Sequence, residues 1–353
     1  MPAASQRAEP RYSSGHPYPS NPNVDPPLTL PDIPEFEPER ETVEVAAGVL
    51  RDARRRVLLA RRPTGRRLAG LWEFPGGKIE PGEASADALA RELAEELDIR
   101  IGPSRPLVSV RHEYPDQIVR LHLFEIHSFE GTPRGVEGQR LRWVPVDELA
   151  SLEMPAADRP LIRLLELDGH FSISPSPTAF ESPNAFLDAW EQCLEAGFRL
   201  IALRPRPGER VAAELVDAID RMTRDRGARW VAAGDLAQCY GWPAHGLQLD
   251  TTELMHLDHR PWPRDRLVIA SCHDLEETRI AESLEADLVT LSPVADDADG
   301  AVEAPLGWDA FERLVEYCPL PVFARGGVRP DDWARARAAG GFGVAGVRAF
   351  GWK

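Results

Sequence analysis

The chain has 353 residues, of which 57 are acidic and 41 are basic, and its formal net charge at pH 7 is −16. This length allows two domains with full cores, and the negative charge argues against direct binding to DNA or to an anionic membrane surface. The sequence shows no apolar stretch long enough to span a membrane and no secretion signal. The four cysteines are scattered without a C-x-x-C pair, which is typical of reduced thiols in a cytoplasmic protein.

Residues 1–41 differ in composition from the rest of the chain. Proline recurs throughout this stretch and large apolar side chains are few. Such a composition cannot bury enough apolar surface to fold, so we expect a disordered, proline-rich leader.

Residues 42–168 carry the patterns of a domain that mixes strands and helices. Short apolar runs, some alternating in polarity, predict strands, and two longer periodic stretches predict helices. Helices packed on a mixed sheet would bury these apolar faces. The predicted strands are Val43–Leu50, Val57–Ala60, Leu107–Arg111, Ile118–Ile126 and Leu141–Pro145, and the predicted helices are Ser85–Leu97 and Ala156–Leu167.

One motif in this domain carries the clearest chemistry. From Gly77 to Glu96 the sequence reads G-x5-E-x7-R-E-L-x-E-E. On a helix, Glu92, Glu95 and Glu96 stand at i, i+3 and i+4 and share one face. Three neighbouring carboxylates repel each other unless a cation neutralises them, and Mg²⁺ prefers such oxygen ligands together with substrate phosphates. A solvated acidic helix face would explain a lone E-x-x-E-E, but it does not explain the fixed Gly, Glu and Arg upstream.

This motif resembles the signature of the Nudix hydrolases. The resemblance implies an α/β/α sandwich with a mixed sheet, and Mg²⁺ as the cofactor with Mn²⁺ as a substitute. Asp98 stands where the family has glycine at the end of the helix, a position where Asp can also adopt left-handed backbone. The implied metal ligands are the Gly77 backbone and the side chains of Glu92, Glu95, Glu96 and Glu137.

Two further stretches, 71–80 and 135–139, resemble the MutT subgroup, which removes oxidised dGTP from the nucleotide pool. This implies a role in DNA replication and repair through mutation avoidance. It assigns proton abstraction to Glu137 or Glu95 and the orientation of Glu83 to Arg91, with a nucleoside monophosphate and pyrophosphate as products. The implied substrate-binding residues are Arg62, Phe74, Lys78, Gln117 and Asp158; an exposed loop carboxylate is the alternative interpretation of Glu137, and a surface arginine that of Arg62.

Two positions depart from that subgroup. Asp158 stands where an asparagine reads the oxidised base, and Gln117 stands in place of an arginine. An amide both donates and accepts, whereas an ionised carboxylate only accepts. The base preference is therefore less firmly predicted than the hydrolytic chemistry.

Residues 170–353 show eight short apolar runs with helical stretches between many of them, which predicts a short (β/α)8 TIM barrel. The runs are Phe171–Ile173, Leu200–Leu203, Trp230–Ala233, Leu247–Leu249, Leu267–Ala270, Leu288–Leu291, Val322–Ala324 and Phe342–Val347, and the predicted helices are Ala185–Ala196, Arg210–Arg224, Leu275–Leu284, Trp308–Tyr317 and Asp331–Ala339.

This half resembles thiamine phosphate synthase through short motifs such as Ser271-Cys272-His273 and residues 324–328. The resemblance implies a thiamine-related phosphate ligand, with Arg204, Ser271, His273, Gly326 and Gly327 as candidate contacts. A tight turn would equally explain the two glycines. The synthase metal ligands are partly replaced, because the corresponding segments read Ala233-Gly234-Asp235 and Asp250-Thr251-Thr252-Glu253.

Three functions stay open from the sequence. The first is a nucleoside triphosphate pyrophosphohydrolase for oxidised dGTP with a degenerate, phosphate-binding barrel. The second is a thiamine-pathway enzyme whose Nudix half hydrolyses thiamine-related pyrophosphates. In the third, the barrel is a sensor or docking module without catalysis.

Overall fold

The computed structural model describes residues 41–295 and 305–352, so the predicted leader, except for residue 41, lies outside the described residues. Among the described residues, no helix combines the length and the apolar character needed to cross a bilayer. The four cysteines are all buried and unpaired, as their scattered spacing predicts.

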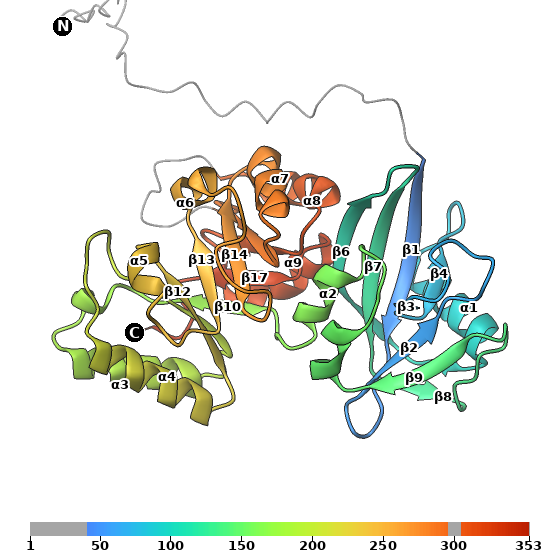
Figure 1. Ribbon diagram of the computed structural model, residues 1–353, viewed down its shortest axis with the longest axis horizontal. Coiled ribbons are helices and arrows are strands. Elements are labelled where there is room, and N and C mark those ends of the chain that lie inside the picture. The colour runs from blue at the N-terminus through green and yellow to red at the C-terminus, as the bar shows by residue number, and fades with distance from the viewer. Residues whose placement is uncertain (1–40, 296–304, 353) are drawn as a thin grey trace, which may run out of the picture. The chain divides into compact units, whose positions relative to one another are not determined.

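The first half of the described chain has the predicted mixed sheet. Its four-stranded sheet has the order β4-β1-β7-β6, in which β1 and β7 are parallel and the other neighbours are antiparallel. A three-stranded antiparallel sheet, β3-β2-β9, and the pair β5-β8 complete it. Helices α1 and α2 lie on opposite sides of the strands (Figure 1). The elements are β1 Thr42–Val49, β2 Val57–Arg61, β3 Trp72–Glu73, β4 Gly76–Lys78, α1 Ser85–Leu97, β5 Arg100–Ile101, β6 Ser104–Glu113, β7 Ile118–Ile126, β8 Phe129–Glu130, β9 Arg140–Val144, the 3₁₀ helix η1 Val146–Ser151 and α2 Arg159–Leu164.

Helix α1 has the predicted bounds because its sequence separates two faces. Leu89, Leu93 and Leu97 are fully buried against the sheet, which leaves the acidic residues on the other side. Asp98 ends the helix in left-handed backbone, with φ 56°, and its N–H donates to the carbonyl of Ala94 at 3.2 Å. The substitution of glycine by Asp98 is therefore accommodated as expected.

Helix α2 is shorter than the predicted Ala156–Leu167. It begins at Arg159, and Pro160 lies in its first turn. Proline lacks the N–H that a later helical position would need, so it is suited to the start of a helix and not to its interior.

The second half is a closed, parallel barrel of eight strands in chain order, β10 to β17. Each predicted apolar run overlaps one strand. Two short helices, α5 and α6, were not predicted; both begin at an aspartate whose side chain caps the helix. The elements are β10 His170–Ile173, the 3₁₀ helix η2 Pro177–Ala179, α3 Pro183–Glu195, β11 Leu200–Leu203, α4 Ala213–Asp225, β12 Arg229–Ala233, α5 Leu236–Cys239, β13 Gly246–Leu249, α6 Thr251–His256, β14 Leu267–Cys272, α7 Leu275–Ser283, β15 Leu288–Leu291, α8 Trp308–Tyr317, β16 Val322–Arg325, the 3₁₀ helix η3 Pro330–Asp332, α9 Trp333–Ala338 and β17 Gly343–Gly346.

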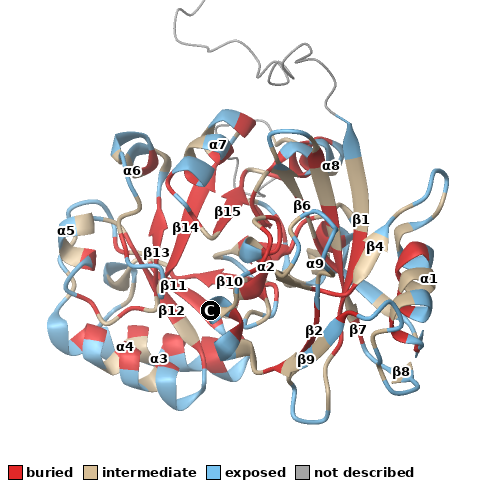
Figure 2. Ribbon diagram, turned by 45° about the vertical axis from the view of Figure 1, so that its right-hand side comes forward, coloured by how far each residue is buried: buried red, intermediate tan, exposed pale blue. Residues whose placement is uncertain are grey.

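The barrel core has two layers of apolar side chains. The outer layer lies between the strands and the surrounding helices. It includes Trp190 of α3, Trp230 of β12 and Phe311 of α8, which are fully buried. Inward-facing residues such as Phe171 and Phe323 fill the lumen. Figure 2 shows the barrel strands buried and the outer faces of the helices exposed. The barrel is thus a packed scaffold that leaves its loops for ligands.

Candidate active site

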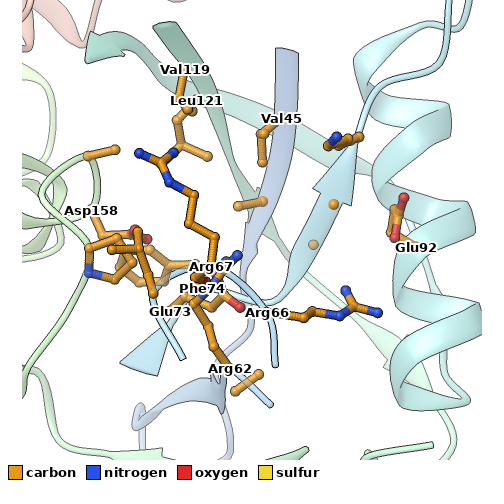
Figure 3. Close-up of a pocket in the computed structure, with 18 of the residues that line it drawn as sticks. Val45, Arg62, Arg66, Arg67, Glu73, Phe74, Glu92, Val119, Leu121 and Asp158 are labelled. Atoms are coloured by element: carbon orange, nitrogen blue, oxygen red, sulfur yellow. Dashed lines mark hydrogen bonds and ion pairs between the residues drawn. The ribbon is translucent and has the colours of Figure 1, made fainter. Parts of the chain in front are cut away.

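One pocket of the first half gathers most of the residues that the motif analysis singled out. Its volume is about 370 Å³. Figure 3 shows Glu92 of α1 on one side of this pocket, with Arg62, Glu73 and Asp158 on the other. We call the side with Glu92, Glu96 and Glu137 the helix end. We call the side with Arg62, Glu73 and Asp158 the Asp158 end. The predicted site residues in the pocket wall are Arg62, Phe74, Gly77, Lys78, Glu92, Glu96, Gln117, Glu137 and Asp158.

The three helix carboxylates do not share one environment. Glu92 and Glu96 line the pocket. Glu95 does not line it; its side chain is 64% exposed and lies 3.6 Å from an Arg91 nitrogen. The structure therefore brings two of the three predicted helix ligands into the pocket.

Arg91 positions the acidic residues around it. Its Nε and Nη2 donate to the two oxygens of Glu83, both at 2.9 Å, which is the expected bidentate pair. Its Nη1 donates to Glu92 at 2.9 Å. These charge-assisted bonds lower the pKa of Glu83 to about 2, with the Arg91 hydrogen bonds as the largest cause. Arg91 thus acts on the site through Glu83 and Glu92.

Gly77 lets the strand β4 approach α1 closely. A Cβ at this position would lie 2.2 Å from Cδ of Glu92, a distance that no side chain can occupy. Any larger residue would displace the Glu92 carboxylate. The glycine of the motif therefore leaves room for the Glu92 carboxylate beside the strand.

The loop that carries Glu137 is tied to the end of α1. The backbone N–H of Val136 and the side-chain amide of Gln139 both donate to the carbonyl of Glu96, each at 2.9 Å. Gln139 also accepts from the Glu137 N–H at 2.9 Å. Glu137 itself accepts from Arg66 at 2.8 Å. Sequence reasoning missed Gln139 and Arg66, because their roles depend on contacts between distant segments.

Negative charge accumulates at the helix end. Burial, followed by the charges of Glu137 and Glu92, raises the pKa of Glu96 to about 7. Within the described residues, no three acidic, histidine or cysteine side chains converge closely enough to coordinate one ion. Glu92 and Glu137 are instead engaged by Arg91 and Arg66. The donor set nevertheless suits a hard divalent cation, because such an ion would relieve the repulsion that burdens Glu96.

At the Asp158 end, two carboxyl groups are buried together. Asp158 is 6% exposed, and burial, followed by the charge of Glu73, raises its pKa to about 8. Burial also raises the pKa of Glu73, which the ion pair with Arg62 opposes. The N–H of Phe74 donates to Asp158. At neutral pH the Asp158 carboxyl is therefore mostly protonated and can donate as well as accept a hydrogen bond.

The other wall residues complete this end. The guanidinium carbon of Arg67 lies over the ring of Tyr114, 4.3 Å from the ring centre. Arg67 also forms an ion pair with Asp116, at 2.6 Å. Gln117 also lines the pocket, and so does Lys78, whose carbonyl accepts from Arg91 of α1. Tyr114 offers an aromatic surface of the kind that stacks on bases, a role that the sequence did not suggest.

In the barrel, the candidate ligand residues lie at or just after the carboxyl ends of the strands, where barrel sites form. Ser271 is on β14, and His273 follows it, with its Nδ1 3.2 Å from Thr251 and 3.1 Å from Glu277. Gly326 and Gly327 have φ of 81° and 66°. A Cβ on Gly326 would lie 2.8 Å from Cα of Pro293, so the turn itself requires glycine.

Comparisons with known proteins divide the chain in the same way. Residues 46–164 match the family described as the NUDIX domain, and residues 176–350 match the thiamine monophosphate synthase family. The CTP pyrophosphohydrolase of Escherichia coli is 40% identical over 121 residues, which are 34% of this chain and 88% of that relative. The 8-oxo-dGTP diphosphatase of the same organism is 33% identical over 124 residues, which are 35% of this chain and 96% of that relative.

Two solved structures resemble the separate halves. The solution structure of the E. coli ORF135 protein is 37% identical, with a TM-score of 0.32, and the match covers 35% of this chain and 87% of that one. A thiamine phosphate pyrophosphorylase from Pyrococcus furiosus is 20% identical, with a TM-score of 0.42, and the match covers 53% of this chain and 89% of that one. The chain thus belongs to the Nudix hydrolases, with 8-oxo-dGTP diphosphatase homologues, and it carries a thiamine phosphate synthase-type barrel behind its hydrolase domain.

Proposed function

We propose that the Nudix domain is an Mg²⁺-dependent pyrophosphohydrolase that cleaves oxidised dGTP to the monophosphate and pyrophosphate. Its cellular role would be to keep a mutagenic nucleotide out of DNA synthesis in the cytoplasm. The observation that carries this proposal is the pocket itself, which joins an acid-rich end to a buried Asp158. The acid-rich end suits a metal-bound polyphosphate, and Asp158 suits the edge of a base.

The helix end would hold the phosphates and the metal ion. The Gly77 backbone, Glu92, Glu96 and Glu137 are the groups that would hold Mg²⁺, which neutralises the polyphosphate and lowers the pKa of an attacking water when bound. Glu137 is the proposed general base, since its side chain is 42% exposed at the pocket and can exchange its bond to Arg66 for one to water. Arg66, once released, can contact a phosphate oxygen. Glu95 would need a rotamer change to contribute.

The Asp158 end would read the base. Oxidised guanine offers an N7–H donor beside the O6 acceptor, whereas guanine offers two acceptors there. A protonated Asp158 presents one acceptor and one donor, as an asparagine would. This pairing supports oxidised over normal guanine. Besides burial, the groups that shift the pKa of Asp158 are Glu73, which raises it, and the Phe74 N–H and Arg62, which lower it.

CTP is a second candidate substrate. Cytosine also offers a donor next to an acceptor, so a protonated carboxyl pairs with its edge equally well. The 40% identity to an E. coli CTP pyrophosphohydrolase favours the same test.

The experiment is pyrophosphate release by the full chain with Mg²⁺, comparing oxidised dGTP, dGTP, CTP and thiamine pyrophosphate at low concentration. We expect kcat/KM to be highest for oxidised dGTP and clearly lower for dGTP. A preference for CTP would move the assignment to the second candidate. A preference for thiamine pyrophosphate would replace the nucleotide proposal by hydrolysis in thiamine metabolism.

A further inference from the structure

A pocket apart from both predicted ligand sites is lined by residues of the hydrolase domain and of the barrel. We call it the junction pocket; its volume is about 280 Å³, and it shares no wall residue with the hydrolase pocket. The carboxyl ends of the barrel strands, around Arg204, Ser271 and Arg325, form what we call the barrel mouth. The junction pocket lies at the opposite end of the barrel, because its wall includes Asp168, shortly before β10, and Arg337, shortly before β17.

Backbone hydrogen bonds join the two sides of the junction pocket. All described residues belong to one compact unit. The N–H of Ser109 on β6 donates to the carbonyl of Gly340, just after α9, at 2.9 Å, and the N–H of Arg111 donates to the carbonyl of Cys318 at 3.4 Å. The strand β6 therefore holds α9 beside the hydrolase sheet, and the wall of the pocket is built from both.

Four arginines line the junction pocket, and none of them forms an ion pair with a carboxylate of the described residues. They are Arg51 and Arg55 after β1, Arg105 on β6 and Arg337 on α9. Their side chains donate instead to uncharged acceptors. Arg51 donates to the carbonyl of Leu165 at 3.2 Å and Arg105 to Nε2 of His127 at 2.6 Å. Arg337 donates to the carbonyl of Phe342 at 3.1 Å. The positive charges are thus held in place without being neutralised.

Two carboxylates share the wall of the junction pocket but lie beyond ion-pair distance from the arginines. Burial lowers the pKa of both Arg51 and Arg337, and the charge of Glu125 opposes that shift in each. Asp168 also opposes it in Arg337 and accepts from the backbone N–H of His170 at 2.9 Å. Because four arginines face two carboxylates, the wall keeps a net positive charge of two.

The arginines carry a cost that an anion would relieve. The Nε of Arg51 is buried and has no hydrogen-bond partner, and Arg337 is only 8% exposed. The charge of Arg55 lowers the pKa of Arg51, and that of Arg105 lowers the pKa of Arg337, so the guanidinium groups repel each other in pairs. Buried charges without counter-charges and buried N–H groups without acceptors are both unfavourable.

We propose that the junction pocket binds a compact phosphate-type dianion. Guanidinium groups suit this ligand because they donate two parallel hydrogen bonds to phosphate oxygens and stay charged at physiological pH. Trp333 is the one aromatic residue of the wall, and the guanidinium of Arg337 already lies over its ring, 4.6 Å from the centre. The pocket therefore favours inorganic phosphate or pyrophosphate over a nucleotide, whose base would need a free ring on which to stack.

The bound anion would also join the two domains. Arg51 and Arg105 belong to the hydrolase domain, whereas Arg337 belongs to the barrel. An anion held from both sides adds a contact that the unfolded chain lacks, so it should stabilise the whole chain by mass action. This proposal depends on the junction pocket alone and does not rest on the substrate proposed for the hydrolase.

The test is calorimetric titration of the full chain with pyrophosphate, in buffer free of phosphate and Mg²⁺. We expect a binding event that Arg51→Gln and Arg105→Gln each weaken by about tenfold or more, since each loses charge-assisted hydrogen bonds. Hydrogen–deuterium exchange locates the event: pyrophosphate should slow exchange in residues 51–56 and 164–168 of the parent. Binding at the barrel mouth or in the hydrolase pocket would not respond to these two substitutions.

Arg54→Gln is the matched control. Arg54 lies in the same turn as Arg55 and carries the same charge, but it is exposed and does not line the pocket. This variant should bind pyrophosphate as the parent does. Melting without anion checks folding, because loss of an uncompensated charge should leave the melting temperature of Arg51→Gln unchanged or higher. A parallel titration with dGMP should show weaker binding at this site than pyrophosphate.

Three results would overturn the proposal. Pyrophosphate does not bind; it binds at parental strength in both well-folded pocket variants; or Arg54→Gln loses as much affinity as they do. The last result would reduce the effect to nonspecific charge. Tighter binding of dGMP than of pyrophosphate, with the same dependence on Arg51, would contradict a compact ligand. If Arg51→Gln fails to fold, Arg105→Gln decides the question, since Arg105 is exposed.

Discussion

The hydrolase pocket and the barrel mouth present opposite charges to phosphate chemistry. The helix end of the pocket crowds Glu92, Glu96 and Glu137, and we propose that it holds a polyphosphate only together with an added cation. The barrel mouth instead places Arg204 close enough to Arg325 for its charge to lower the pKa of Arg325, so the nearest fixed charges there are positive. The difference distinguishes the proposed site of metal-dependent hydrolysis from a barrel mouth that carries its own positive charge.

The largest expected effect is at the helix end. Glu96→Gln should lower kcat with oxidised dGTP by about a thousandfold or more, because a ligand of the proposed metal loses its charge. Melting in EDTA should show an unchanged or higher melting temperature, since the substitution also removes repulsion from Glu92 and Glu137.

Glu214→Gln provides the matched control, because Glu214 is exposed on α4, far along the chain from the pocket residues. It should retain parental activity. Near-normal turnover by a well-folded Glu96→Gln protein would contradict the assignment of Glu96 as a metal ligand. The hydrolase pocket would then no longer differ from the barrel mouth in needing an added cation.

A smaller effect is expected at Arg91, which acts through its neighbours. Arg91→Lys keeps the positive charge but cannot form the bidentate pair with Glu83. We expect kcat to fall about 10- to 100-fold, as for residues that orient metal ligands. The Mg²⁺ concentration for half-maximal activity should rise, which a purely structural role would not cause. Unchanged Mg²⁺ dependence would contradict the positioning role.

The two regions also differ in how much of them the sequence could predict. The spacing from Gly77 to Glu96 predicted α1 with its observed bounds, because the leucine stripe and the acidic face have one period. Glu95 was assigned to the metal with Glu92 and Glu96, yet the structure leaves it outside the pocket. Helical spacing places residues on a face, but it does not decide which of them a neighbouring loop will cover.

At the barrel mouth, the sequence predicted the strands better than the site. Arg204 and Ser271 were among the candidates, whereas Arg325 and Gln248, which both donate to Ser271, were not. These contacts join side chains of β13, β14 and β16. Asp250 and Glu253 were compared with metal ligands, but the structure engages them in a helix cap. The partners of these residues lie far away in the sequence. Which contact each residue makes is therefore decided by the packing of the fold and cannot be predicted from a motif.

The protonation state of Asp158 predicts how the base preference of the hydrolase pocket depends on pH. Its pKa of about 8 means that the neutral form, which donates, is lost as the pH rises through 8. The preference for oxidised dGTP over dGTP should therefore fall about tenfold by pH 9 in the parent. Asp158→Asn should keep its preference over the same range, which also controls for titration of the substrate. An identical pH profile in both proteins would contradict base reading by the neutral acid.

The same residue predicts a pH-dependent stability difference. An acid whose pKa is raised by folding binds a proton in the native state that the unfolded state has lost, so its contribution to stability falls between about pH 4 and pH 8. The advantage of Asp158→Asn in melting temperature should be small at pH 4.5 and larger at pH 8.5. A constant difference across this range would show that Asp158 is ionised in the folded protein.

The smallest effect concerns the helix cap at the barrel mouth. Asp250→Ala removes one half of the capping box and should destabilise the protein by about 1 kcal/mol, seen as a lower melting temperature. Asp258→Ala, at an exposed position shortly after α6, should leave the melting temperature unchanged. If Asp250 serves only the helix cap, Mg²⁺ should not alter the difference between parent and variant. A gap that widens on adding Mg²⁺ would instead make Asp250 a metal ligand, and the barrel mouth would then resemble the hydrolase pocket in needing a cation to bind phosphate.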